Sequence, residues 1–182
     1  MSTREACASV LVAVVTLICV AVDAAAQDGP GLGEPISAAD LAPWDLSIQP
    51  DGTGLPAGSG TAAVGAQIYA VKCSACHGEK GAGQPNDRLV GGQGTLTELA
   101  QVRTIGSFWP YASTVFDYIR RAMPFQAPES LTNDEVYALT AYLLALNGII
   151  DEDDAMNART LARVRMPNRD GFILAYPAPV QR

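Results

Sequence analysis

Apolar residues recur with helical spacing in three segments of the chain, at residues 61–72, 111–123 and 132–148. In each segment they return every three or four positions, which places them on one face of a helix and predicts that this face is buried. No segment alternates apolar and polar residues over a length convincing for a strand. The pattern therefore predicts an all-α core. The three stripes are Val64, Ile68 and Val71; Ala112, Phe116, Ile119 and Met123; and Val136, Leu139, Leu143 and Leu146.

The third of these helices has the clearest end signals. Thr132 and Glu135 have the spacing of a capping box, in which each side chain satisfies a free amide at the start of the helix. Asn147 and Gly148 then form a typical stop signal. A further short helix is possible at residues 95–102.

The first 26 residues have the pattern of a secretory signal peptide. Arg4 precedes an apolar run at residues 10–22, and small residues lead to a cleavage site expected after Ala26. The run is short for a membrane span, which needs about 20 residues. The pattern predicts a periplasmic protein with no stable membrane insertion after cleavage, and an uncleaved anchor is the alternative.

Two irregular regions flank the helical segments. Residues 27–60 are rich in glycine and proline, which excludes long helices and strands. Interleaved apolar residues favour an arm that lies on the surface of a domain, and a disordered leader is the alternative. The predicted organisation is a signal peptide at 1–26, this N-terminal arm, a domain at 61–148 and a tail at 149–182 that wraps the domain.

The 182 residues have a formal net charge of −7. An acidic chain with few lysines is a poor candidate for binding nucleic acid. Removal of the signal peptide would also remove Cys7 and Cys19, so that Cys73 and Cys76 are the cysteines that remain. No disulfide framework beyond that one pair is then available.

These two cysteines and the single histidine of the chain, His77, form one Cys-x-x-Cys-His motif. This motif is the attachment signature of c-type haem. Each thiol adds to one haem vinyl group, and the imidazole that follows can bind the iron. A structural zinc site needs four ligands, usually cysteine and histidine, and the processed chain has three such residues. A thioredoxin-like pair expects a βαβ setting that the helical pattern does not provide. We therefore predict one covalently attached haem c, with His77 as an iron ligand.

Met123 is the predicted second iron ligand, because the chain has no second histidine. Pro124 disfavours helical torsions at the residue before it, so the helix is expected to end at Met123 and to leave its thioether on an extended segment. A methionine in such a position is more often core packing, but the missing ligand favours coordination as a His/Met pair. Met166 is the reserve candidate, and Met156 is expected at the surface or in a minor part of the core.

The stretch GAQIYAVKCSACHG, residues 65–78, resembles class I cytochrome c. The resemblance implies that family's fold, in which Gly65 and Tyr69 would let the first helix cross the last one closely. Tyr142 would be their aromatic partner on the last helix. In that family a proline after the motif offers its carbonyl to the far nitrogen of the haem histidine, and Pro85 is the matching candidate. Such a bond fixes the ring and raises its basicity.

A narrower resemblance covers most of the processed chain. It links the chain to the cytochrome subunits of periplasmic sulfite and sulfane dehydrogenases, the partners of molybdenum-containing, sulfite-oxidase-like subunits in Sox-type sulfur oxidation. It implies transfer of single electrons from a molybdopterin subunit to a downstream cytochrome c or terminal oxidase. Some members carry two haems, and the single motif here matches only the single-haem form, which favours sulfite dehydrogenase. The stretches concerned are WDLSIQPDGTGLPAGSG, TIGSFWPYASTVFDYIRRAMPF, SLTNDEVYALTAYLLALNGII and RMPNRDGF.

Two other functions stay open at this point. One is a freely diffusing periplasmic electron carrier. The arm and tail argue against it, because a minimal carrier would not need them. The other is a catalytic haem protein with a labile sixth ligand, against which Met123 argues.

Three residues before and at the start of the second helix are candidates for contact with the haem propionates. Indole and guanidinium donors suit carboxylates, which points to Trp109 and Arg103, with Tyr111 beside them. Simple packing in the core or at the surface is about as plausible for each of the three. Arg120 and Arg121 are expected on a solvated helix face, with contact to an acidic partner as the alternative.

Overall fold

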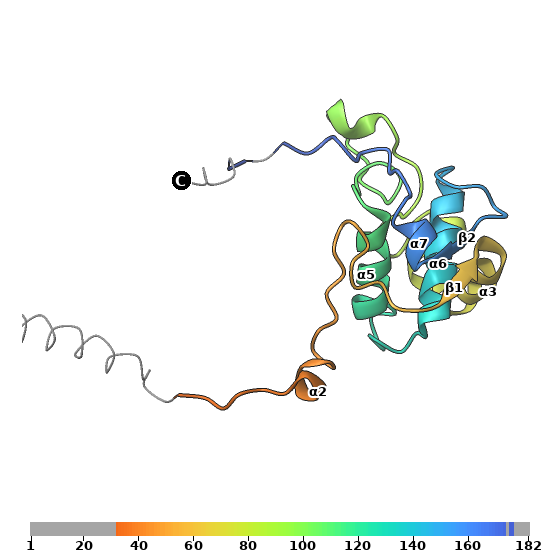
Figure 1. The fold of residues 1–182 in the computed structure, drawn as a ribbon. Helices are drawn as coiled ribbons and strands as arrows, with labels where there is room; N and C mark the ends of the chain where they lie inside the picture. The colour runs from red at the N-terminus through yellow and green to blue at the C-terminus, as the bar shows by residue number, and fades with distance from the viewer. Residues whose placement is uncertain (1–31, 174, 177–182) are drawn as a thin grey trace, which may run out of the picture. The chain divides into compact units, whose positions relative to one another are not determined.

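The computed structural model describes residues 32–173 and 175–176 (Figure 1). The predicted signal peptide at 1–26, the first residues of the arm and the end of the tail lie outside this range. The chain divides into two units, Met1–Asp45 and Leu46–Arg182. Within the described residues no helix has the length and apolar character needed to cross a membrane.

The described part of the first unit contains one short helix, α2, at Ala38–Leu41. Its N-cap is Ser37, whose hydroxyl accepts a hydrogen bond from the amide of Asp40. The large apolar side chains of this segment are exposed, and they are Leu32, Ile36, Leu41 and Trp44.

Three longer helices form the second unit: α3 at Ala62–Lys72, α5 at Ala112–Ala122 and α6 at Asn133–Leu146. The helical segments predicted from the apolar pattern are thus confirmed. The segment at 95–102 instead forms one 3-10 turn, η2, at Thr95–Thr97, followed by exposed bends. Leu99 is fully exposed, so a longer helix here would gain little stabilisation from packing.

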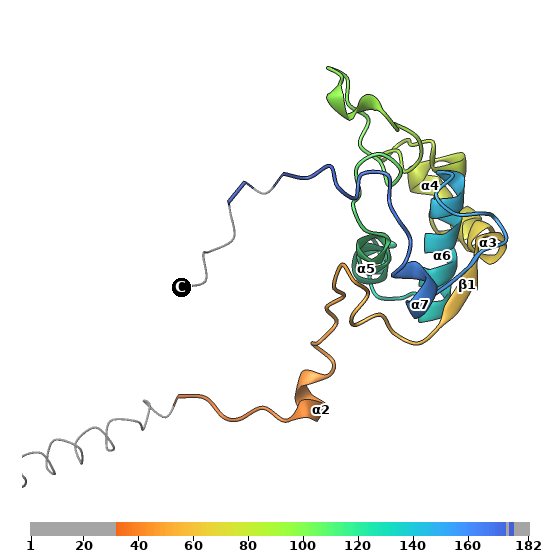
Figure 2. The ribbon, with the colours of Figure 1, turned by 45° about the horizontal axis from the view of Figure 1, so that its top comes forward.

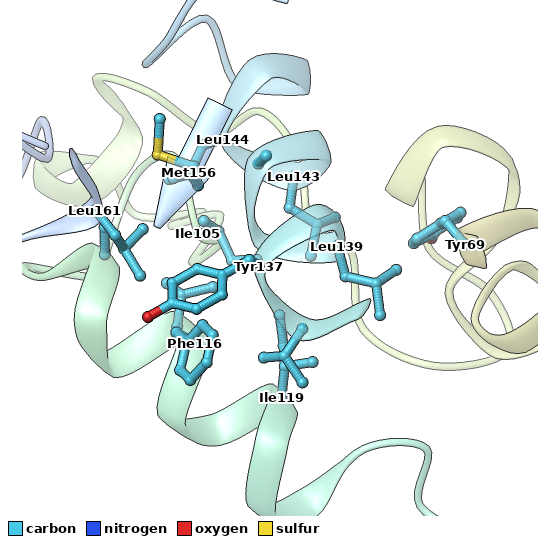
Figure 3. Packing of buried hydrophobic residues seen from close by; sticks show 14 of the residues in the cluster. Tyr69, Ile105, Phe116, Ile119, Tyr137, Leu139, Leu143, Leu144, Met156 and Leu161 are labelled. Atoms are coloured by element: carbon cyan, nitrogen blue, oxygen red, sulfur yellow. The ribbon is translucent and has the colours of Figure 1, made fainter. Parts of the chain in front are cut away.

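The buried core lies between α5, α6 and the segments that follow α6. Phe116 of α5 and Tyr137 of α6 pack with their ring centroids 4.4 Å apart. Figure 3 shows this pair, with Met156 and Leu161 lying on the same side of α6. The prediction that Met156 is peripheral is wrong, because its side chain is buried in this main cluster.

The first long helix, α3, buries a different face from the one predicted. Val64 and Val71 are 49% and 81% exposed, whereas Gly65 and Tyr69 are buried. The apolar stripe was therefore the wrong criterion for α3. This helix contacts α6 through Gly65 and Tyr69, and the close crossing at Gly65 leaves no room for a branched side chain at that position.

The crossing of α3 and α6 agrees with the expectation that the class I cytochrome c resemblance gave. A Cβ atom at Gly65 would lie 2.0 Å from the carbonyl oxygen of Ala138 and 2.7 Å from Cβ of Tyr142. Tyr69 and Tyr142 pack beside this point with their ring centroids 5.4 Å apart. The absence of a side chain at Gly65 is what allows the two helices to approach so closely.

A two-stranded antiparallel sheet joins the two flanks of the second unit. Strand β1 at Ser59–Thr61 pairs with β2 at Ala155–Asn157, and Gly60 lies opposite Met156. Three residues are too few to show an alternating pattern, so periodicity does not predict either strand. Helix α7, Ala158–Leu161, follows β2 directly and begins with a capping box at its N-cap residue.

The stretch that precedes β1 lies against α5 and α6. The Tyr137 hydroxyl donates to the carbonyl of Pro56 over 2.8 Å, and the Ser113 hydroxyl donates to the carbonyl of Pro50 over 3.1 Å. Figure 2 shows this stretch leading into β1 beside α6. Side-chain hydrogen bonds from two helices thus replace the secondary structure that glycine and proline prevent here.

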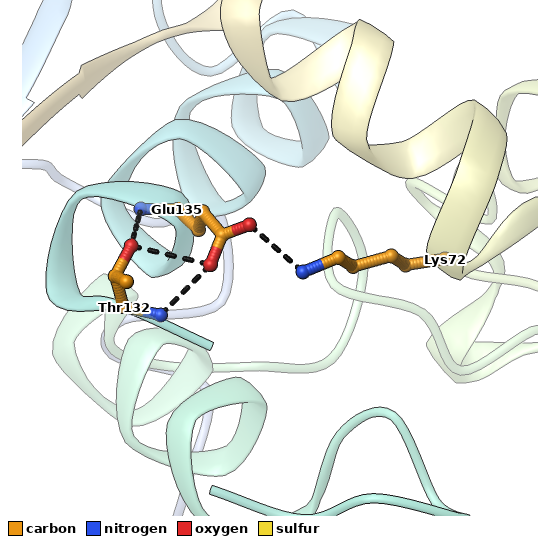
Figure 4. A network of polar contacts seen from close by, with 3 residues as sticks. All are labelled: Lys72, Thr132 and Glu135. Atoms are coloured by element: carbon orange, nitrogen blue, oxygen red, sulfur yellow. Dashed lines mark hydrogen bonds and ion pairs between the residues drawn. The ribbon is translucent and has the colours of Figure 1, made fainter. Parts of the chain in front are cut away.

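The predicted capping box at the start of α6 is present and is joined by a lysine from α3 (Figure 4). The amide of Thr132 donates to Oε2 of Glu135 over 2.8 Å. Lys72 forms an ion pair with Oε1 of the same carboxylate, also at 2.8 Å. The hydrogen bond from Lys72 and the Thr132 amide hold the pKa of Glu135 below its ordinary value of 4.5.

This ion pair predicts a pH dependence of stability. A carboxylate whose pKa is lowered by folding stabilises the folded state above its unfolded pKa, and that contribution is lost as the pH falls through the folded value. Glu135→Gln should therefore lower stability at neutral pH and reduce the loss of stability that occurs as the pH falls below the ordinary carboxyl pKa of 4.5. Urea unfolding midpoints measured across this range check the prediction. The exposed Glu98→Gln serves as the control, and equal acid slopes in wild type and Glu135→Gln would contradict it.

Candidate cofactor site

The Cys-x-x-Cys-His motif lies on one turn of helix directly after α3. Helix α4 spans Ser74–His77, and the amides of Cys76 and His77 both donate to the carbonyl of Cys73, over 3.1 and 3.0 Å. Gly78 ends this turn with φ of 75°, a left-handed conformation that favours glycine. The single turn brings both thiols and the imidazole close together, as attachment to one planar cofactor requires.

A carbonyl oxygen fixes the ring of His77. Nδ1 of His77 lies 2.9 Å from the carbonyl oxygen of Asp87. Because a carbonyl only accepts, this bond places the proton on Nδ1 and leaves the lone pair of Nε2 available to a metal. The structure thus corrects the assignment of this contact to Pro85, since the partner is two residues further along the loop.

The loop after the motif is held against it by backbone hydrogen bonds. The amide of Gly83 donates to the carbonyl of His77 over 2.7 Å, and the amide of Asn86 donates to the carbonyl of Cys76 over 2.8 Å. This turn carries the chain back toward the imidazole, so that Asp87 rather than Pro85 faces Nδ1. The loop geometry, which the sequence pattern does not specify, decides which carbonyl is used.

A cavity of about 370 Å³ lies beside the motif. Its size falls in the range of about 300–1,000 Å³ that is usual for small-molecule and cofactor sites. Six of the eight predicted site residues line it. They are Cys73, Cys76, His77, Arg103, Trp109 and Met123.

The remaining two predicted residues, Pro85 and Tyr111, are not part of the cavity wall. Tyr111 is the N-cap residue of α5, and the guanidinium of Arg169 lies over its ring, 4.3 Å from the centroid. Proximity in sequence to Trp109 therefore does not bring Tyr111 to the cavity, because the start of α5 directs it toward the C-terminal tail.

Met123 lines the cavity from the end of α5. The helix ends at Ala122, and Met123 has extended torsions, with φ of −122° and ψ of 146°. The predicted release of this residue by Pro124 is therefore seen in the backbone. The reserve candidate Met166 is 1% exposed, belongs to the core and does not line the cavity. The structure thus favours Met123 over Met166 as a ligand from this side.

Arg103 and Trp109 line the cavity from the loop before α5. Arg103 donates from Nη2 to Oε1 of Gln101 over 2.9 Å, and its guanidinium lies 5.2 Å from the ring centroid of Phe108. The Trp109 ring packs edge-on against Tyr118 of α5, with centroids 5.6 Å apart. Both side chains are thus held in place by protein contacts beside the cavity.

The apolar part of the cavity wall contains residues that the motif analysis did not single out. Ile119, Leu139 and Leu143 belong to the predicted apolar stripes of α5 and α6, and Val115 lies on α5 outside its stripe. The other three lie in loops without any periodic signal. These apolar residues are Leu89, Ile105, Val115, Ile119, Leu131, Leu139 and Leu143. An apolar wall of this kind suits a macrocycle with hydrophobic faces.

Asn147, at the end of α6, fastens the loop that carries Leu89. Its Oδ1 accepts from the amide of Gly91 over 3.0 Å, and its Nδ2 donates to the carbonyls of Leu89 and Leu143 over 3.2 and 2.8 Å. The sequence identified Asn147 only as a helix stop. Its side chain has the further role of fixing one wall of the cavity.

The chemistry of these residues fits a covalently attached haem. Burial raises the pKa of the Cys73 thiol to about 11, as expected for a cysteine beside an apolar cavity. Two thiols, an imidazole with Nε2 available and a thioether line the same cavity. The guanidinium of Arg103 and the indole of Trp109 line it as well, and both are donors that suit carboxylates.

Comparison with known proteins agrees with this assignment. Residues 60–143 match the family model described as "Cytochrome C oxidase, cbb3-type, subunit III". The chain is similar to a chain in the crystal structure of the sulfane dehydrogenase SoxCD from Paracoccus pantotrophus, with 41% sequence identity and a TM-score of 0.76. The similarity covers 80% of this chain and 72% of that one. A search of curated proteins gives no match.

Proposed function

The chain belongs to the cytochrome c family, and from this premise we propose that it is a monohaem electron-transfer subunit of a molybdenum-containing sulfite dehydrogenase or a related enzyme. Membership confirms the expected class I cytochrome c fold and implies a covalently bound haem c. The observation that carries the proposal is the single cavity wall shared by Cys73, Cys76, His77 and Met123.

Each of these residues has a distinct role in the proposal. Cys73 and Cys76 would hold the haem through two thioether bonds, and His77 and Met123 would be the ligands of its iron. The bound haem supplies a one-electron couple between ferric and ferrous iron. Asp87 keeps the imidazole in one orientation through its carbonyl, and the apolar wall excludes water from the site.

The mouth of the cavity supports electron exchange with another protein. Tyr118 and Phe125 both line the cavity and are 50% and 78% exposed. The cavity wall thus reaches the molecular surface at these two aromatic side chains. A redox partner that docks there would come close to the cofactor, and contacts of this kind are typically small and transient.

The class of partner is inferred from the similarity to the structure of the sulfane dehydrogenase SoxCD. We propose a molybdopterin, sulfite-oxidase-like subunit as electron donor and a downstream cytochrome c or terminal oxidase as acceptor. The single Cys-x-x-Cys-His motif of the sequence favours sulfite dehydrogenase over forms with two haems. The signal peptide predicted at residues 1–26 would place this reaction in the periplasm.

The test uses the full chain with its own leader, produced in its source organism with a C-terminal affinity tag. We expect a periplasmic protein whose mass corresponds to cleavage after Ala26 plus one haem, purified together with molybdenum. Sulfite should reduce the haem in this preparation, and removal of the molybdenum subunit by high salt should abolish that reduction. A molybdenum-free monomer that unrelated donors reduce equally well would instead support a free carrier, and peroxide turnover would support a catalytic haem.

A further inference from the structure

The C-terminal tail contacts the loop that carries two cavity residues, although the tail itself does not line the cavity. The side-chain amide of Asn168 donates from Nδ2 to the carbonyl of Phe108 over 2.8 Å. The ring of Phe172 packs edge-on against the ring of Phe108, with centroids 5.3 Å apart. Asn168 and Phe172 of the RMPNRDGF stretch therefore both hold Phe108. Asn168 binds its backbone carbonyl, and Phe172 packs against its ring.

The Arg103 side chain also packs against Phe108. The guanidinium of Arg103 lies 5.2 Å from the centroid of the Phe108 ring, within the range of a cation–π contact. Trp109, which follows Phe108 directly, lines the cavity together with Arg103. A displacement of Phe108 would therefore move both cavity residues of this loop.

The inner side of the same loop is fixed independently. The Thr104 hydroxyl donates to the carbonyl of Gly91 over 2.5 Å, and the Ser107 hydroxyl donates to the carbonyl of Val102 over 2.6 Å. These buried bonds hold the backbone at residues 102–107. They do not hold the Arg103 side chain, whose described contacts are Gln101 and Phe108. The position of the guanidinium thus depends on Phe108 together with Gln101.

We infer that Asn168 and Phe172 are positioning residues for the cofactor site: by holding Phe108, they keep the Arg103 guanidinium and the Trp109 ring in the cavity wall and so raise the reduction potential of the bound haem. The inference rests on the haem proposed above and not on the identity of the partner. A positive charge beside the cavity favours ferrous iron, because that state carries one positive charge less. Water that replaced the guanidinium would favour the ferric state for the same reason.

The experiment measures the reduction potential of the purified haem-loaded protein in wild type and variants. Phe172→Ala tests the inference without a change of charge, and the half-exposed position of this side chain makes folding of the variant expected. Asn168→Ala removes the hydrogen bond to Phe108. Arg165→Gln is the matched tail control, since Arg165 is exposed and pairs with the exposed Asp170.

We expect Phe172→Ala and Asn168→Ala to lower the potential, in the same direction as Arg103→Gln and by a smaller amount. Arg165→Gln should leave it unchanged. In the Arg103→Gln background, Phe172→Ala should cause much less of a shift than in wild type, because the two residues act through one contact.

Two results would overturn the inference: a wild-type potential in Phe172→Ala, or a Phe172→Ala shift that adds in full to that of Arg103→Gln. A chain that binds no haem would show in its visible spectrum before any potential is measured. That outcome would count against the proposed function, whereas a loaded chain with unchanged potentials counts against the positioning role alone.

Discussion

Met123→Leu is expected to remove the methionine–iron charge-transfer band from the ferric spectrum and to lower the reduction potential sharply. Leucine has a similar volume and no sulfur, so the cavity stays filled while the proposed thioether ligand is lost. Axial ligands set haem potentials over about 0.8 V, and loss of a methionine should lower the potential by on the order of 0.1–0.3 V. Absorption spectroscopy and redox titration of the haem-loaded protein measure both effects.

Met166→Leu is the matched control for this prediction. Met166 is buried in the core and does not line the cavity, so the same change there should leave the band and the potential in place. If the band survived in Met123→Leu and disappeared in Met166→Leu, the ligand assignment would be wrong. Binding of added imidazole by Met123→Leu, and not by the control, would support an open coordination position.

Gly65→Ala is expected to destabilise the protein strongly, although alanine is the better helix former. On an isolated helix the change would be favourable by about 1 kcal/mol. Here the new Cβ would lie 2.0 Å from the carbonyl oxygen of Ala138, so α3 and α6 must move apart. Overpacking of this kind costs about 1–3 kcal/mol, and contact with backbone rather than a flexible side chain favours the upper end.

Ala70→Gly provides the comparison on the same helix. Ala70 is exposed, so this change should cost only the helix propensity of about 1 kcal/mol. Urea unfolding of the haem-loaded variants gives both free energies. A Gly65→Ala protein as stable as wild type would show that the helix crossing adapts easily, and the packing argument for Gly65 would fail.

The sequence predicted the site better than it predicted the surroundings of the site. Cys73, Cys76 and His77 follow from a motif whose spacing has one chemical reason, and Met123 follows from Pro124 and the lack of another histidine. By contrast, the acceptor for His77 is a carbonyl in an irregular loop. Every residue has a carbonyl, so residue type could not distinguish Asp87 from Pro85.

The helices were also predicted only in part. Apolar periodicity identified α5 and α6 because their stripes face the core. It gave the wrong face for α3, where the contact is made by Gly65 and Tyr69 and the valines face outward. Hydrophobicity scales reward large side chains, and a close helix crossing selects small ones. Only the resemblance to class I cytochrome c indicated the correct face.

The pairing of β1 with β2 has a consequence for the order of maturation. Contacts between residues so far apart in the chain close a large loop, and the entropy of that closure delays their formation relative to local helical contacts. Strand β2 also follows β1 along the chain, so it is the last of the two to be synthesised. We therefore expect the segment around Cys73 to stay reachable by haem-attaching enzymes until the ends of the unit meet, so that covalent attachment precedes closure of the fold.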